Sequence, residues 1–226
     1  MNHNGHLTNV PDLSGVQSQI QNSPSGPIGI PLEATVHLPG VVRSQIVAGA
    51  THFAALIDSS VYTWGDPRYP APLGRMDPET RPPSSPATSV PGIVYDLEDL
   101  EDDEKVAKIA AGGYLTAALT NGGDCYIWGA QELGWSGRPV PVDLRVIDVA
   151  VGEECVVLIA ERDDGGREIW VRGHSRHGEL GLGKVEEVKE WTKVLLDVPE
   201  DRKLVQVVAG AKCVLLEVRK EATPTR

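Results

Sequence analysis

The 226-residue chain carries a formal net charge of −11 at pH 7, and 41% of its residues are hydrophobic, which predicts a folded domain and excludes a wholly disordered chain. Its 24 glycines and 17 prolines favour many turns and argue against a helical bundle. The acidic excess lies mainly before Lys105 and no basic patch is visible, so we expect no direct binding to nucleic acid or to a membrane.

The first 30 residues carry one charged side chain, Asp12, among Asn, Gln, Ser, Gly and Pro. Their apolar residues follow neither a helical nor a strand period, so we predict a disordered N-terminal tail over 1–30. The segment also lacks the basic and apolar regions of a signal peptide. We expect the folded region to cover 31–219 and a second disordered tail to cover 220–226.

The folded region contains an internal repeat, in which four segments align on a glycine. They are IVAGATHFAALI (46–57), IAAGGYLTAALT (109–120), VAVGEECVVLIA (149–160) and VVAGAKCVLLEV (207–218), aligned on Gly49, Gly112, Gly152 and Gly210. Apolar residues precede each glycine, and apolar character resumes after two variable positions. The glycines are 63, 40 and 58 residues apart, so the copies are separated by insertions of different length.

A second block follows the first three copies and ends on a glycine. The blocks are VYTWG (61–65), CYIWG (125–129) and IWVRG (169–173). The connections contain glycine pairs in two of the three copies, and glycine supplies the positive φ that tight hairpins require. Each unit therefore reads as strand, hairpin and strand, and the repetition predicts a β-propeller or β-solenoid.

These residues resemble the regulator of chromosome condensation repeat, whose pattern is V-x-x-[IV]-x-x-G-x-x-H-x-x-A-L, a turn, V-Y-x-W-G and then G-Q-L-G. The fit is close at 49–65 and at Gly178-Glu179-Leu180-Gly181, although His52 is the only motif histidine that is retained. The resemblance covers about 32–218 and implies an all-β fold, a β-propeller of this type. About four blades are present, so the ring is partial or open relative to seven blades. Such a ring is expected to leave unpaired strand edges at both ends.

No pattern typical of a catalytic, cofactor or metal site is found, and we predict none of the three. His174 and His177 are expected in a variable loop, and Cys155 and Cys213 as small buried residues. The residues expected to hold the repeats together are Gly49, His52, Tyr62, Trp64, Gly65, Gly112, Tyr126, Trp128, Gly129, Gly152, Trp170, Gly173, Gly181 and Gly210.

An insert over about 66–105 separates the first two copies. It contains seven prolines between Pro70 and Pro91, and seven of the nine residues over 96–104 are acidic. One interpretation is a solvated, mobile insertion. The other is a partner-binding arm that steers a basic surface toward candidate residues Asp99, Glu101, Asp102 and Asp103. Further along, Val188, Trp191 and Leu195 lie at helical spacing, although the resemblance implies a strand-forming segment at this place, and we expect a short packing element between blades.

We expect a non-catalytic scaffold that binds another protein, because repeat architectures expose broad surfaces on a fixed framework. The resemblance implies two alternatives: a guanine-nucleotide exchange factor for a small GTPase, and an adaptor subunit in ubiquitin transfer or chromatin modification. The expected partner is therefore another protein, with a small GTPase and a basic protein surface as the two candidates, and the chain is expected to self-associate if the ring is open. Three widely spaced cysteines predict an intracellular protein of the cytoplasm or nucleus.

Overall fold

The computed structural model describes residues 44–75, 88–101, 104–131, 134–183, 187–199 and 201–220. The predicted N-terminal tail and residues 221–226 lie outside these ranges, as do Asp102 and Asp103. Lys220, assigned to the C-terminal tail from sequence, is the last residue of a strand instead. Within the described ranges, no helix has the length and apolar character needed to span a membrane.

The described chain forms four antiparallel sheets, called blades 1 to 4 in chain order. Blade 1 contains β1(Ser44–Ala48), β2(His52–Ile57), β3(Ser60–Gly65) and β4(Gly92–Ile93); blade 2 contains β5(Val106–Gly112), β6(Leu115–Thr120), β7(Cys125–Gly129) and β8(Val140–Pro141); blade 3 contains β9(Val146–Val151), β10(Cys155–Glu161), β11(Arg167–His174) and β12(Glu187–Val194); blade 4 contains β13(Arg202–Ala209) and β14(Val214–Lys220). In blades 1 to 3, each strand pairs with the next one along the chain. This meander is the arrangement that the strand–hairpin–strand repeat predicts.

Short turns join the second and third strands of blades 1 to 3. In blade 2 the turn contains Gly123 and in blade 3 it contains Gly165, both with positive φ. Blade 1 has no glycine there, and Asp58 and Ser59 take φ values of 48° and 73° instead. Asp tolerates this left-handed region better than most residues, so a tight hairpin forms without the usual glycine signal.

The described part of the predicted insert helps to build blade 1, which corrects the interpretation of a purely solvated segment. Gly92 and Ile93 pair with Thr63 and Tyr62 of β3 to make the fourth strand. Between β3 and β4, the 3-10 helix η1(Ala71–Leu73) buries Leu73 completely. A second one, η2(Tyr95–Leu97), follows β4.

The helical spacing of Val188, Trp191 and Leu195 does not correspond to a helix in the structure. Val188 and Trp191 lie in β12, which pairs antiparallel with β11 as the fourth strand of blade 3. Leu195 follows this strand. Apolar residues three or four positions apart in a short segment do not distinguish a helix from a strand, and pairing with β11 decides between them here.

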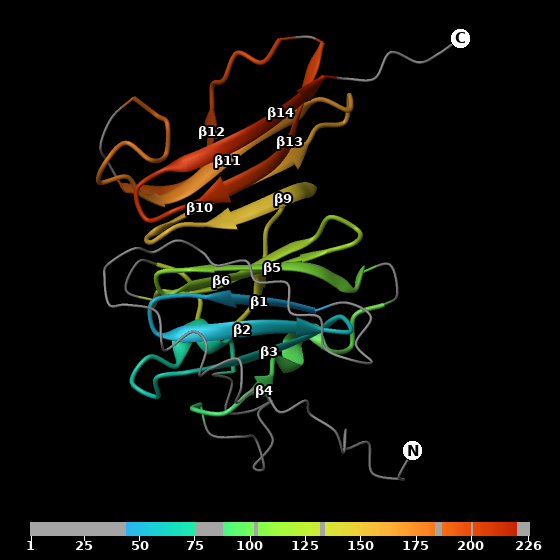
Figure 1. Ribbon diagram of the computed structural model, residues 1–226. Helices are drawn as coiled ribbons and strands as arrows, with labels where there is room; N and C mark the ends of the chain where they lie inside the picture. Colours follow the sequence, from blue (N-terminus) through green and yellow to red (C-terminus); the bar gives the residue numbers. More distant parts are fainter. Residues whose placement is uncertain are drawn as a thin grey trace.

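The blades pack face to face in chain order, from the blue and cyan strands of blade 1 to the red strands of blade 4 (Figure 1). A separate apolar cluster fills each of the three junctions. Ala54, Ala117 and Val157 are equivalent residues, five positions after the repeat glycine, and each faces the next blade and is at most 1% exposed. Burial between neighbours therefore supplies most of the core.

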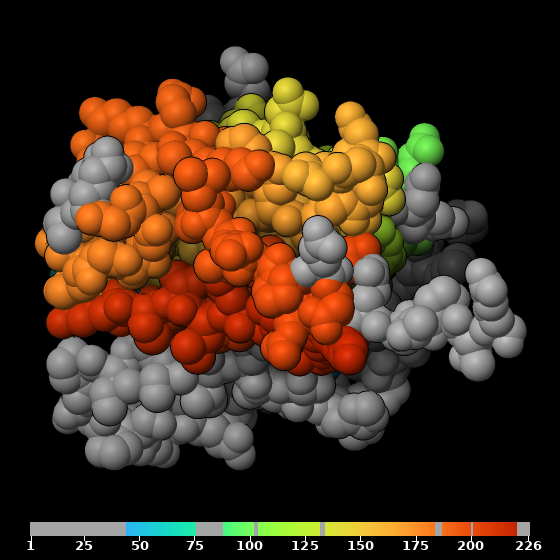
Figure 2. Space-filling view, turned by 90° about the horizontal axis from the view of Figure 1, so that it is seen from above, coloured from blue at the N-terminus to red at the C-terminus, as the bar shows by residue number. Residues whose placement is uncertain are grey.

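Blades 1 and 4 lie at opposite ends of the row, so the described sheets do not close a ring (Figure 1). In the four-stranded sheet of blade 1, the edge strands β1 and β4 each pair with one described strand only. Blade 4 consists of one hairpin, and its outward face is seen in red in Figure 2. On this face Val208 and Leu215 are opposite one another and are 39% and 66% exposed. Cys213 is exposed as well, contrary to expectation, because no following blade among the described residues covers it.

Candidate functional site

The repeat residues occupy equivalent positions in the first three blades. The glycine that ends the second block lies opposite the residue three positions after the repeat glycine, in the pairs His52–Gly65, Leu115–Gly129 and Cys155–Gly173. Trp64 and Trp128 are almost fully buried, and Arg172 takes the same place in blade 3. Among the other residues predicted to hold the repeats together, Tyr62 is buried, and Tyr126 and Trp170 are half-buried. Gly181 lies in a turn with φ of +69°.

The first three repeat glycines, Gly49, Gly112 and Gly152, lie where one blade touches the next. The backbone N–H of Ala50, just after Gly49, donates to the carbonyl of Gly113 in blade 2 at 2.6 Å. A Cβ atom on Gly112 would lie 2.4 Å from the carbonyl oxygen of Gly152 in blade 3. The absence of a side chain therefore lets the backbones of neighbouring blades approach each other.

A polar network around His52 joins blade 1 to blade 2. His52 is 1% exposed, and its Nε2 lies 2.7 Å from Oγ1 of Thr116. The Thr116 hydroxyl donates to the carbonyl of Pro72 at 2.9 Å, and the Trp128 indole N–H donates to the same oxygen at 2.8 Å. Thr116 uses its single proton on Pro72, so its oxygen accepts from Nε2–H of His52. This assigns the Nε2–H tautomer to the neutral imidazole of His52.

Burial lowers the pKa of His52 from 6.5 to about 4. The unfolded chain therefore binds more protons than the folded chain between these values, so acidification through this window destabilises the fold by up to about 3 kcal/mol. We expect His52→Gln to remove this part of the decline, when urea unfolding is measured from pH 7 to pH 4. The control is His177→Gln at an exposed position, and an unchanged profile in His52→Gln would contradict the assignment.

A polar side chain occurs four residues before every repeat glycine and faces the inner strands of the blades. These residues are Gln45, Lys108, Asp148 and Gln206, and together they line a polar cavity of about 430 Å³. The Gln45 amide donates to the carbonyl of Ile109 at 2.9 Å and accepts from its N–H at 2.8 Å. Asp148 accepts from Lys108 at 2.7 Å and from the backbone N–H of Val207 at 2.8 Å. These bonds link the inner strands β1, β5, β9 and β13.

The acidic segment runs from η2 toward β5. Val94 and Leu97 are 0% and 2% exposed, so they anchor the segment in the core between blades 1 and 2. Asp96 forms an ion pair with Arg138 at 3.3 Å. Asp99 and Glu101 are exposed, and the other two candidates, Asp102 and Asp103, lie outside the described residues.

The remaining candidates show no catalytic arrangement among the described residues. His174 is the last residue of β11, not part of a loop, and its ring lies 3.9 Å from both Glu154 and Glu187. Cys155 is buried, and this burial raises the pKa of its thiol to about 12. A thiol with so high a pKa carries almost no reactive thiolate at neutral pH. No group of three potential metal ligands occurs in the described ranges.

Comparison with known proteins gives relatives in sequence and in fold, although no family model matches the chain. The chain is 31% identical over 180 residues to the RCC1 domain-containing protein RUG3, mitochondrial, of Arabidopsis thaliana, covering 74% of this chain and 38% of that protein. It is 29% identical over 165 residues to the E3 ubiquitin-protein ligase HERC2 of Mus musculus, covering 67% of this chain and 3% of that protein. The chain thus spans less than half the length of these relatives.

Among solved structures, Prp20p from Saccharomyces cerevisiae covers 78% of this chain with a TM-score of 0.60 and 19% identity. The match covers 44% of Prp20p, and at this identity it shows the fold alone. The predicted all-β propeller of partial extent is confirmed by this match and by the four meandering sheets. The repeats, the blades and the relatives agree: the chain belongs to the RCC1-like repeat family.

Proposed function

We propose that the chain is a non-catalytic scaffold that binds a basic protein surface through its acidic connector, defined here as residues 96–104. The observation that carries this proposal is the anchoring of the connector. Val94 and Leu97 are buried, while Asp99 and Glu101 remain exposed. Because the beginning of the connector is already held by buried side chains, it loses less conformational entropy on binding than an unanchored acidic loop would lose.

The electrostatics of the connector favour a cationic partner. Partial burial, followed by the nearby charge of Asp99, raises the pKa of Glu98 above its usual value. Because both effects disfavour the ionised carboxyl group, the attraction of a Lys or Arg side chain placed beside it would offset them. The same concentration of negative charge increases the rate at which a basic surface associates.

We expect neutralisation of the candidate residues to weaken binding at least tenfold. The test variant combines Asp99→Asn, Glu101→Gln, Asp102→Asn and Asp103→Asn, and binding to purified core histones and to a panel of small GTPases is measured at low salt. Histones are included because the structure of Prp20p is described together with its binding to Gsp1p and histones. The matched control combines Glu153→Gln, Asp163→Asn, Glu190→Gln and Asp201→Asn, all at exposed positions.

The control has the same net charge as the test variant, so it separates a local effect from a general one. Equal losses in both variants, or no loss in the test variant, would contradict the role of the connector. An intracellular place of action remains a prediction from the cysteine pattern.

A second candidate function is guanine-nucleotide exchange on a small GTPase. The fold shared with Prp20p favours it, since that protein is described with its binding to Gsp1p. Small GTPases loaded with a fluorescent guanine nucleotide would be mixed with the chain, and faster release from one of them is the expected result. Unchanged release from every member of the panel would remove this candidate and leave the scaffold.

A further inference from the structure

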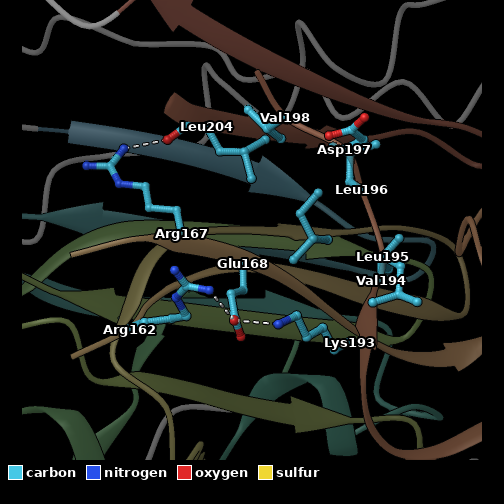
Figure 3. Close-up of a pocket in the computed structure, with 11 residues that line it drawn as sticks. Arg162, Arg167, Glu168, Lys193, Val194, Leu195, Leu196, Asp197, Val198 and Leu204 are labelled. Atoms are coloured by element: carbon cyan, nitrogen blue, oxygen red, sulfur yellow. Dashed lines mark hydrogen bonds and ion pairs between the residues drawn. The ribbon is translucent and has the colours of Figure 1, made fainter. Parts of the chain in front are cut away.

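A cavity opens at the rim of the molecule where blade 3 meets blade 4. It lies between the start of β11, the end of β12, the connection that follows β12, and β13 (Figure 3). Its volume is about 440 Å³. A second hollow of about 330 Å³ adjoins it and shares Arg162, Arg167, Val198 and Leu204. The two together are called the rim cavity.

The rim cavity is cationic in a chain whose net charge is −11. Five cationic side chains line it: Arg162, Arg167, Lys193, Arg202 and Lys203. Its lining contains two carboxylates, Glu168 and Asp197. The positive excess lies far along the sequence from the acidic connector, and it favours an anionic ligand by simple charge complementarity.

Hydrogen bonds hold three of these cationic groups in place, those of Arg162, Arg167 and Lys193. Glu168 accepts from Lys193 at 2.5 Å and from Arg162 at 3.4 Å, and Lys193 is the main cause of the lowered pKa of Glu168. Arg162 is also held by Asp164 at 2.7 Å. Arg167 donates to the carbonyl of Leu204, which directs its guanidinium toward the shared part of the two hollows (Figure 3). Groups that are already positioned lose less entropy when a ligand binds.

One wall of the rim cavity is apolar and open to water. Leu195 is 90% exposed and Leu196 is 48% exposed, and both lie in the connection between β12 and β13. Val194, Val198 and Leu204 continue this wall toward the interior. Adjacent exposed leucines beside a cavity are typical of a binding surface, because their cover by a partner removes apolar area from water.

We propose that the rim cavity binds an acidic peptide segment that carries at least one large apolar side chain. Its carboxylates lie against Arg167 and Arg202, and its apolar side chain covers Leu195 and Leu196. A simple inorganic anion would leave the leucines in water, and a purely apolar peptide would leave the arginines unmatched. This site goes beyond the proposed scaffold function, since it uses another surface and the opposite charge, so either can fail without the other.

The test measures fluorescence anisotropy of a labelled eight-residue peptide with two adjacent leucines flanked by Glu and Asp, titrated with the full chain. We expect saturable binding that weakens as salt is raised. Arg202→Glu and Leu195→Asp should each weaken it at least tenfold. Both positions are exposed, so both variants are expected to fold, and thermal unfolding checks this. Lys189→Glu, with a side chain 76% exposed on β12 and outside the rim cavity, should change the affinity less than twofold.

The competing ligands are separate arms of the same titration. An equal affinity for the peptide with Gln and Asn in place of Glu and Asp would overturn the proposal, as would an equal loss in Lys189→Glu. Complete competition by millimolar inorganic phosphate would overturn it in favour of a plain anion site, and tighter binding of an RNA oligonucleotide in favour of a nucleic-acid site. Failure to bind any acidic peptide would overturn it outright, while leaving the histone assay on the acidic connector unaffected.

Discussion

Gly112→Ala is expected to destabilise the fold by about 3 kcal/mol. The new Cβ atom would lie 2.4 Å from the carbonyl oxygen of Gly152 and 2.5 Å from that of Val151, both in the next blade. These are backbone atoms of a paired strand, so relief requires movement of one blade against the other. Urea unfolding followed by circular dichroism measures the loss.

Gly210→Ala provides the matched control within the same repeat. Its Cβ atom would meet Cys213 of its own turn, with Sγ at 3.2 Å, and would meet no other described residue within 4 Å. We expect a change within about 1 kcal/mol, because a modest local contact is opposed by the reduced flexibility of the unfolded chain. Gly152→Ala should fall between the two, since its Cβ atom would lie 2.7 Å from Sγ of Cys155 in its own turn and 3.2 Å from the carbonyl oxygen of Gly210 in the next blade. Equal losses at Gly112 and Gly210 would contradict the packing of blades through these glycines.

Asp148→Ala is expected to cost about 3 kcal/mol, a second large effect. Its side chain links three blades, because it lies in blade 3, accepts from Lys108 in blade 2 and accepts from the Val207 N–H in blade 4. The substitution leaves a buried backbone N–H and a half-buried ammonium group without their acceptor. Thermal and urea unfolding should both move to milder conditions.

Two further variants separate the parts of this effect. Asp148→Asn keeps an oxygen acceptor for Val207 while it removes the charge, so it should cost less, about 1 kcal/mol. Asp163→Ala in the exposed turn between β10 and β11 should change stability by no more than about 0.5 kcal/mol. A loss in Asp148→Ala no larger than that in Asp163→Ala would show that the three-blade bridge adds nothing.

The second and third strands of blades 2 and 3 could be predicted from sequence because two apolar runs flank a glycine-containing turn. The sequence predicts the first block as a single strand, whereas the structure divides it at the repeat glycine into the first and second strands of each blade. The glycine alignment also placed equivalent residues in the same register, as the pairs His52–Gly65 and Leu115–Gly129 show. The fourth strands were less readable. β4 and β8 are two residues long, so they carry no period, and pairing with a preceding strand defines them.

The candidate surfaces were predicted less completely than the fold. The acidic connector was visible as a run of charge, but its anchoring by Val94 and Leu97 depends on contacts between two blades. The polar residues four positions before each glycine were readable as a pattern and were missed, since a polar residue in a strand is more often exposed to solvent. The rim cavity was not predictable, because Arg167 and Arg202 come from different blades and meet only when these pack.

The uncovered face of the β13–β14 hairpin determines where the protein unfolds first. In blades 1 to 3 the residue five positions after the repeat glycine is sealed by the following sheet, whereas Leu215 is two-thirds uncovered. Each sheet draws its cohesion from its neighbours, and this hairpin has a described neighbour on one side. Local unfolding should therefore begin at β13 and β14 and then extend to blade 3. Blade 4 should separate first, while the sheets of the middle blades remain folded.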